Sequence, residues 1–453
     1  MSIEESLLIL SGLIIAYTVF VIFLNKKGYF EKYNISFYGP ALLLRTSKGV
    51  GFLQKIAQKK RFWKAFGNFG IVFCFIMMIF MVLLIALNMW AVLGFTPEQQ
   101  ESLPGLEFGL VIPGLNPLLP LEYIFYILVA LIVAVIVHEF SHGILTFAQN
   151  LKVKSLGILY LIIPLGAFCE PDEDQIRETG LKKRMRVYAA GPMSNFTIAF
   201  IMLILFSSVF MASVQPIDGV HVLYTVEDSP AEKLGFHEGV IITSMNNSDI
   251  ANINDFYNVM DNTSINQTIA IKYLDNNILN TETVTLASKY TYTNLSEHKN
   301  TSFLGIVDNP YLHGFLFSLQ RPFTFNFPNG LIILYSLPFL SYLIGYNPIV
   351  APYTSGYTIN GPLGMIPSDA FWPIVNLLYW VFWLNLVVAF FNVLPMIPLD
   401  GGFLFSDALR GIIQKFKKNI NEEQQEKLVK NITLVLSLLI LIIVLSPWLV
   451  KYF

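Results

Sequence analysis

Two histidines and a glutamate are spaced so that they could bind a metal ion and activate water. His138, Glu139 and His142 form the pattern H-E-x-x-H. On a helix, His138 and His142 lie one turn apart on the same face, and Glu139 lies about a quarter turn to one side. Two histidines in this arrangement are typical zinc ligands, and the carboxylate is placed to act on water at the zinc. The pattern therefore predicts a hydrolytic zinc site.

The surroundings of this pattern separate it from a chance match of five positions. It lies in an apolar stretch from about residue 121 to 150, and a membrane-spanning helix needs about 20 such residues. A charged side chain at the centre of a membrane helix costs about 2.5–3.5 kcal/mol on insertion scales, so such groups are usually paired or functional. Three ionisable groups within five positions therefore indicate function rather than packing.

Asp400 is the best candidate for the third ligand that a catalytic zinc ion normally takes. Inside the apolar stretches, formal charges are nearly confined to Glu139 and Asp400. The remaining histidines lie in or just after a polar region that we expect across the membrane from the pattern: His221, His237, His298 and His313. The alternative is that Asp400 only marks the water interface or caps a helix that begins after it.

The sequence before Asp400 predicts a break in the helix at membrane depth. Pro395 and Pro398 cannot both sit in an undistorted helix, because each removes a donor and clashes with the preceding turn. Such irregular backbone is tolerated in a membrane only where it is buried in protein or faces a wet cavity. We expect Gly401 and Gly402 to allow a sharp turn directly after Asp400.

The composition is that of an integral membrane protein. Of 453 residues, 54% are hydrophobic and 13% are charged, against about 25% charged residues in soluble domains. The mean hydropathy is +0.58. The net charge of −2 gives no case for nucleic acid binding, and the two cysteines, Cys74 and Cys169, do not indicate a disulfide framework.

The hydropathy pattern predicts about six spans, near residues 7–24, 69–93, 121–150, 187–213, 371–398 and 432–450. Lysine and arginine are dense at 25–66, in the loop after residue 150 and at 410–430, which predicts that these segments are cytoplasmic. The H-E-x-x-H pattern and Asp400 then share the cytoplasmic end. The apolar stretch 330–344 would reverse the order of the spans, so we expect it to be interfacial or re-entrant.

Residues 214–308 have the composition of a soluble domain on the other side of the membrane. Aspartate, asparagine, serine and threonine become common, and alternating runs at 267–273 and 281–286 predict strands. A length of about 95 residues lies within the usual range for one domain. Between residues 152 and 168 we expect short β-like pieces, broken at Gly157, Pro164 and Gly166.

Three separated motifs resemble those of the site-2 proteases, the zinc intramembrane metalloproteases. They are H-E-F-S-H from His138 to His142, A-G-P-M-S-N from Ala190 to Asn195, and N-V-L-P-M-I-P-L-D-G from Asn392 to Gly401. Their order and membrane placement also match, and the resemblance covers roughly residues 110–410. It implies that His138, His142 and Asp400 bind zinc, that Glu139 is the general base, and that the substrate is a membrane-spanning segment.

The same resemblance assigns roles to three further residues. Asn392 and Pro395 match positions that contact the unfolded substrate. Asn195 carries over only as a structural residue, for which we expect a hydrogen bond between helices. An extended substrate could add to an exposed strand edge in residues 152–168.

The polar domain resembles a PDZ domain. The run D-S-P-A-E-K-L-G-F-H-E-G-V-I-I-T-S-M-N, from Asp228 to Asn246, is similar to the usual S-P-A-x-x-A-G-x-x-x-G-D-x-I, with Val240 where Asp is typical. Because the domain is tethered between the two halves of the predicted catalytic set, we expect it to exclude substrates with large external domains. The alternative is that it recruits substrates by binding a peptide terminus.

We therefore expect an α-helical polytopic membrane protein of about six spans with an inserted extracytosolic PDZ-like α+β domain. Its expected divisions are a first span with a basic loop, a membrane half with the H-E-x-x-H helix, the PDZ-like domain, an interfacial segment and a second membrane half: 1–66, 67–213, 214–308, 309–370 and 371–453.

The predicted function is zinc-dependent cleavage of membrane-spanning protein segments, with one Zn2+ per chain. The expected setting is the plasma membrane of a prokaryote, with the site near the cytoplasmic side and with transmembrane proteins and the lipid bilayer as partners. The alternatives are an inactive membrane scaffold of the same family and a zinc transporter, although the spans lack the polar path that a transporter needs.

Overall fold

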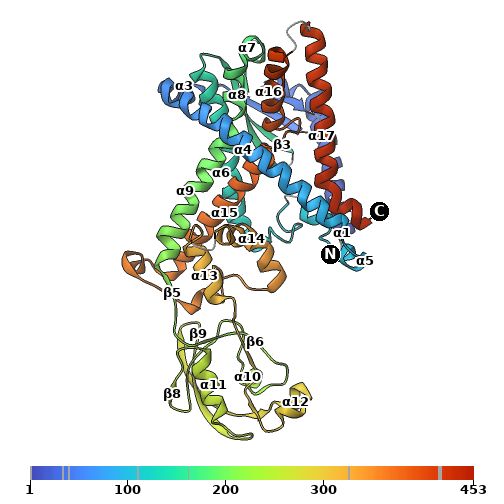
Figure 1. Cartoon of the computed structure of the whole chain (residues 1–453). Helices are drawn as coiled ribbons and strands as arrows, with labels where there is room; N and C mark the ends of the chain where they lie inside the picture. Colours follow the sequence, from blue (N-terminus) through green and yellow to red (C-terminus); the bar gives the residue numbers. More distant parts are fainter. Residues whose placement is uncertain are drawn as a thin grey trace. The chain divides into compact units, whose positions relative to one another are not determined.

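The computed structural model describes residues 3–32, 35–38, 41–109, 112–161, 163–324, 327–416 and 421–452 (Figure 1). The chain forms two compact units, one made of residues 1–201 and 380–453 and the other of residues 202–379. Each unit is described by itself below.

Five helical segments are long and apolar enough to cross a membrane within the part of the chain that the structure describes: Lys60–Leu93, Leu121–Ala148, Leu181–Ser213, Ser368–Asn392 and Glu422–Tyr452. They correspond to five of the six predicted spans. The predicted span at 7–24 lies in helix α1 (Ile3–Lys26), whose first side chains are outside the described set, so the sixth span stays a prediction. The second span begins at Lys60, well inside the predicted basic loop.

The first unit packs its spans around a small apolar core. Helices α4 (Lys60–Leu93), α9 (Ala190–Ile204), α15 (Ser368–Asn392) and α16 (Asp400–Phe416) contribute buried side chains to it: Cys74, Met78, Met193, Phe196, Ala389 and Leu404. The other side of α4 stays uncovered, since Leu87 is 66% and Trp90 81% exposed. Large apolar side chains that face outward along a long helix are expected where lipid is the solvent.

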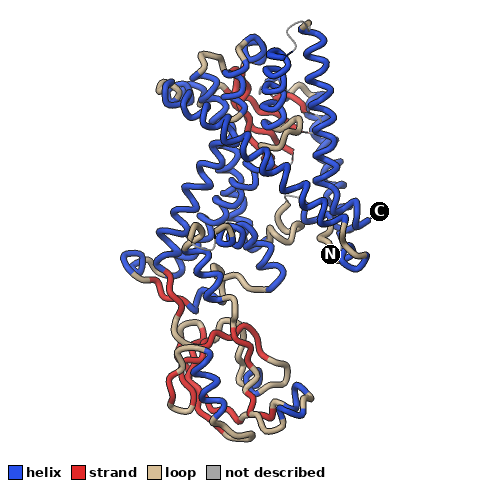
Figure 2. The backbone as a smooth tube through the Cα atoms, in the orientation of Figure 1, coloured by secondary structure: helices blue, strands red, loops and turns tan. Residues whose placement is uncertain are grey.

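A four-stranded antiparallel sheet lies among the helices of this unit (Figure 2). Its strands, in spatial order, are β1 (Ile35–Tyr38), β2 (Ala41–Thr46), β3 (Val153–Leu161) and β4 (Ile163–Pro171). Two expectations are corrected here. The basic loop contains the hairpin β1–β2, and β3 and β4 are nine-residue strands rather than short pieces. Of the expected breaks, the one near Pro164 and Gly166 is present as a shift in the pairing of these two strands. Position 157 of β3 requires glycine, because Leu44 and Phe168 leave no room for a side chain there.

The second unit contains the predicted soluble domain. Its main sheet has the order β10–β9–β7–β6–β13, with strands Ile278–Thr285, Thr268–Asp275, Ile241–Met245, Val220–Thr225 and Ile306–Asp308, and β8 (Ser248–Asp249) beside β7. Helices α10 (Pro230–Lys233) and α11 (Ile253–Asp261) accompany it, and buried residues such as Phe256 and Ile271 form one core. The two predicted strands are confirmed as β9 and β10, in a sheet-containing domain as expected.

The segment after this domain is folded too. Helix α13 (Leu312–Gln320) precedes α14 (Asn329–Ile344), which covers the predicted interfacial stretch and has 16 residues, fewer than the spans above. Strand β14 (Tyr357–Ile359) then pairs with β5 (Val214–Pro216). The strand that leads into the soluble domain is therefore paired with a strand that follows α14. Whether α14 is interfacial or re-entrant stays a prediction.

Candidate metal centre

Helix α6 (Ile124–Ala148) presents His138 and His142 on one face, as their spacing predicts. Their rings are 4.9 Å apart between centroids and nearly perpendicular, at 76°. The side chains are 10% and 12% exposed. Two imidazole rings are thus held together in a nearly dry environment.

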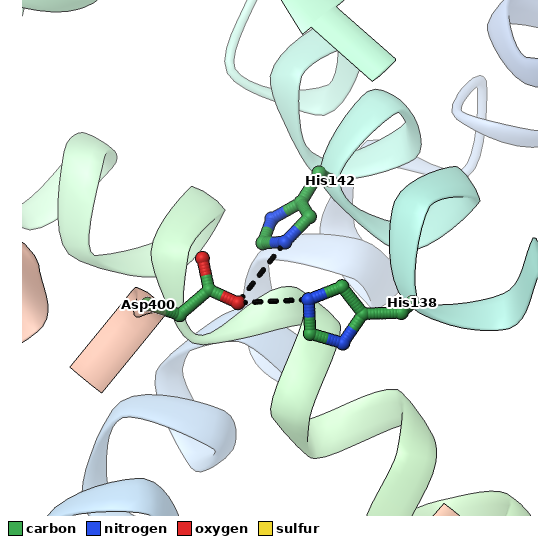
Figure 3. A group of neighbouring side chains, drawn as sticks. All are labelled: His138, His142 and Asp400. Atoms are coloured by element: carbon green, nitrogen blue, oxygen red, sulfur yellow. Dashed lines mark ion pairs between the residues drawn. The ribbon is translucent and has the colours of Figure 1, made fainter. Parts of the chain in front are cut away.

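Asp400 lies against both rings (Figure 3). Its Oδ2 atom is 2.9 Å from Nε2 of His138 and 3.2 Å from Nε2 of His142. Among the described residues this is the group of metal-ligating side chains whose ligand atoms converge, all within 4.8 Å of one another. The structure brings together the three residues that the sequence analysis chose as ligands.

The break before Asp400 is present, but the two glycines act differently from the prediction. Helix α15 ends at Asn392, and α16 begins at Asp400 itself, so Gly401 and Gly402 lie in its first turn. No sharp turn follows Asp400. A Cβ atom at 402 would lie 2.6 Å from the backbone of Met396, and one at 401 would overlap the backbone of Val393. The glycines let the irregular segment pass directly against the start of α16.

Gly191 of helix α9 closes the other side of the site. A Cβ atom at this position would lie 2.5 Å from Nε2 of His138 and 2.6 Å from Nε2 of His142. Real Cβ atoms do not approach that closely, so any side chain here would displace the ligand rings. From sequence, the motif from Ala190 to Asn195 indicated only a family resemblance and not this role, although a glycine inside a helical span was the available signal.

A hydrogen bond to the backbone determines which ring nitrogen of His142 carries the proton. Its Nδ1 atom lies 2.8 Å from the carbonyl oxygen of Val187, which can only accept, so Nδ1 carries the proton. In a neutral imidazole, Nε2 is then a bare acceptor directed at a carboxylate oxygen. Asp400 Oδ2 is buried and has no hydrogen bond of acceptable geometry in the described part of the chain. A lone pair of His142 that faces a carboxylate oxygen without a proton between them fits a bound cation.

This donor set fits zinc in particular. Two histidine nitrogens and one carboxylate oxygen are the ligand types of a catalytic zinc site, which leaves a fourth position for water or substrate. The Val187 carbonyl supplies the outer hydrogen bond that usually fixes the orientation of a zinc-binding histidine. The matching atom of His138, Nδ1, is buried without a hydrogen-bond partner among the described residues.

Glu139 is held by the sheet. The backbone N–H of Cys169, on strand β4, donates a 2.8 Å hydrogen bond to Oε2 of Glu139. Strand β3 pairs with one edge of β4. The N–H of Cys169 points away from β3 and towards Glu139, so the second edge of β4 faces helix α6. A candidate base and an unpaired strand edge are therefore side by side.

The remaining predicted site residues lie outside the converging group. Asn392 donates from Nδ2 to the carbonyl oxygen of Val388 at 3.0 Å, and Pro395 is buried in the irregular segment. Asn195 is fully buried, and neither of its amide atoms has a hydrogen-bond partner among the described residues. The predicted hydrogen bond from Asn195 to another helix is therefore wrong.

A sequence model of peptidase family M50 matches residues 126–440, which is more than half of the chain and includes the whole site. The chain belongs to peptidase family M50. This family contains the site-2 proteases and consists of zinc metalloproteases, so the resemblance found in the three motifs is confirmed.

Individual relatives extend over most of the M50 chain or over one part of it. An uncharacterised protein of Methanocaldococcus jannaschii, MJ0971, is 27% identical over 395 residues, which cover 86% of this chain and 82% of that protein. Among solved structures, the PDZ domain of an SdrC-like protein from Listeria monocytogenes is 20% identical and has a TM-score of 0.19. The match covers 96% of that domain and 22% of this chain.

Proposed function

We propose that this M50 chain is a zinc-dependent intramembrane endopeptidase that cleaves membrane-spanning segments of other proteins. The observation that carries the proposal is the convergence of three metal-ligating atoms, two from one candidate span and one from the break after another, where the His142 nitrogen faces the carboxylate without a proton. Glu139, on the same helix as two of these atoms, supplies the general base that hydrolysis needs.

His138, His142 and Asp400 would hold the zinc ion. When bound, zinc supplies a Lewis acid for a peptide carbonyl and lowers the pKa of water to about 7. Gly191 keeps the approach to the histidine nitrogens free of side-chain atoms. The Val187 carbonyl holds the proton of His142 on Nδ1 and so leaves Nε2 available as a ligand.

Glu139 would move the proton in both halves of the reaction. As a carboxylate it accepts a proton from the attacking water, and as an acid it returns that proton to the leaving amine. The N–H of Cys169 fixes one of its two oxygens, so the other remains free for the proton. A peptide bond would be cleaved into a carboxylate and an amine with no other reactant than water.

The sheet offers a way to hold an extended substrate beside Glu139. In the order β1–β2–β3–β4, strand β3 is covered on both sides, so the edge expected in residues 152–168 belongs to β4 alone. An extended segment can add to such an edge through backbone hydrogen bonds. A substrate helix must unwind for this, which also exposes the carbonyl to be attacked. Asn392 and Pro395 are proposed to contact this unwound segment.

Cleavage of a membrane-embedded substrate by the purified protein tests the proposal. The full chain in lipid nanodiscs is mixed with a single-span model protein, and the products are mapped by mass spectrometry. We expect a cut within the span, inhibition by a zinc chelator, and a loss of at least about 100-fold in Glu139→Gln, because the amide cannot accept the proton. Full zinc content with no cleavage by the parent protein would favour a scaffold instead.

The PDZ-like domain is proposed to lie outside the membrane and to filter substrates by size, with the metal site near the cytoplasmic side. The alternation of spans and the positions of basic residues support this arrangement. Replacing residues 220–306 with a flexible linker, while keeping the β5–β14 pair, is the direct test. Short substrates should still be cleaved, and large ones should be accepted better. Loss of cleavage of short substrates in a zinc-loaded variant would favour recruitment.

A further inference from the structure

A buried ion pair joins two short helical segments that flank the metal centre. Arg184 lies on α8 (Leu181–Tyr188), and Asp407 lies on α16. Arg184 Nε donates to Asp407 Oδ2 at 2.8 Å, and its Nη2 donates to Oδ1 of the same carboxylate. Arg184 is 8% and Asp407 4% exposed. Both carboxylate oxygens are therefore engaged by one planar guanidinium.

Each of these helices also carries a group of the metal centre. Val187, three residues after Arg184 on α8, supplies the carbonyl that orients His142. Asp400 begins α16, seven residues and about two turns before Asp407. The ion pair thus links the helix that orients one candidate ligand to the helix that supplies another.

A second contact between these helices is a ring stack, which fixes their spacing but not their register. Tyr188 and Phe403 are stacked, with ring centroids 5.4 Å apart and an interplanar angle of 27°. Stacked rings tolerate sliding, since offset arrangements are of similar energy. A two-pronged arginine–carboxylate pair has one favoured geometry. Arg184 and Asp407 therefore constrain the register of α16 along α8 more strictly than the stacked rings do.

We propose that Arg184 and Asp407 are positioning residues of the metal centre, whose pairing sets the distance of Asp400 from the two histidines. This inference rests on the proposed zinc site. A metal site tolerates ligand displacements of about 0.2 Å, so a small slide of α16 is enough to weaken binding. Net stability is not the main contribution of the pair, because apolar replacement of a buried ion pair is often neutral or stabilising.

Zinc affinity of the full chain, measured in nanodiscs by competition with a chromophoric chelator, tests the proposal. The principal variant is the double substitution Arg184→Met with Asp407→Leu, which fills the space without leaving an unpaired charge. We expect zinc binding to weaken about 10- to 100-fold, as for other outer partners of metal ligands. The thermal midpoint of the metal-free protein should stay the same or rise. The absorption spectrum of the Co2+-loaded protein should change, since it reports ligand geometry.

Two further variants keep the test sharp. Arg184→Lys keeps the charge but loses the two-pronged geometry, so it should weaken zinc binding as well. Glu173→Gln removes the exposed partner of Arg177 on the neighbouring helix and should leave zinc affinity unchanged. Parent-like zinc affinity and Co2+ spectrum in the double variant would overturn the proposal, and a parent protein that binds no zinc would instead overturn the proposed function.

Discussion

Helix α16 carries two buried acidic side chains about two turns apart, and their surroundings differ in one respect. Asp407 meets a guanidinium that satisfies both of its oxygens. Asp400 meets two histidine nitrogens, at least one of which offers a lone pair rather than a proton. The first group balances donors and acceptors, whereas in the second the His142 nitrogen and the carboxylate are both acceptors. A buried polar cluster with facing acceptors suits a bound cation, whereas a balanced one needs no further partner.

Removing a ligand from the unbalanced group should have the largest effect. Asp400→Ala and His142→Ala should each reduce zinc from about one ion per chain to a small fraction, because a catalytic site has only three protein ligands. Elemental analysis of the purified protein measures this directly. Full zinc retention in Asp400→Ala would show that Asp400 is not a zinc ligand, and its role would then not differ from that of Asp407 in the way described above.

A side chain at position 191 should also disturb the metal centre, by crowding rather than by ligand loss. Gly191→Ala should weaken zinc binding about 10- to 100-fold, because overpacking costs roughly 1–3 kcal/mol and the atoms in the way are ligand nitrogens. Gly143→Ala on α6 is the matched control, since its Cβ would meet the ends of Leu53 and Cys169. Equal zinc affinities in the two variants would contradict this explanation of Gly191.

Asn195 extends the comparison to a polar group that has no partner. Asn195→Leu should raise the thermal stability of the metal-free protein by about 1 kcal/mol or more, because it removes an unsatisfied buried amide. We also expect cleavage to slow, since an unpaired buried amide is retained mainly where function needs it. Lower stability in this variant would show that the amide is paired in the native protein.

The smallest effect is expected at Glu170, where a carboxylate is paired but half-exposed. Hydrogen bonds from Ser155 and Arg45 hold the pKa of Glu170 below its ordinary value. The folded form therefore gains stability when Glu170 is ionised, above its unfolded pKa, and loses it as the pH falls through the folded pKa. Glu170→Gln should cost less than about 1 kcal/mol at neutral pH. The difference should vanish in acid, and thermal scans across pH would reveal any other pattern.

The residues of the candidate site were predictable because each departs from its surroundings. His138, Glu139 and Asp400 are ionisable groups in apolar stretches, so membrane energetics singles them out without a structure. The positions of the strands β9 and β10 followed from alternation of polar and apolar residues. Signals of this kind depend only on residues near one another in the chain.

The missed features depend on contacts between distant segments. The hairpin β1–β2 lies in a basic stretch whose charge pattern resembles that of a loop, and its pairing partner β3 is more than a hundred residues away. From sequence, Arg184 was one of several basic residues that predicted a cytoplasmic loop, and only the structure shows that it pairs with Asp407. The glycines after Asp400 fit a turn equally well until the path of residues 393–399 showed what they make room for. In each case the role of the residue depends on a segment that is distant in sequence.

The distance along the chain between the ligands has a consequence for biosynthesis. His138 and His142 leave the ribosome more than 250 residues before Asp400, so a growing chain carries two candidate ligands and the candidate base long before the third candidate ligand. Throughout that interval the candidate centre is incomplete. Only when α16 has been made can the set close. The order of synthesis thus keeps the candidate metal centre incomplete until most of the chain has been made.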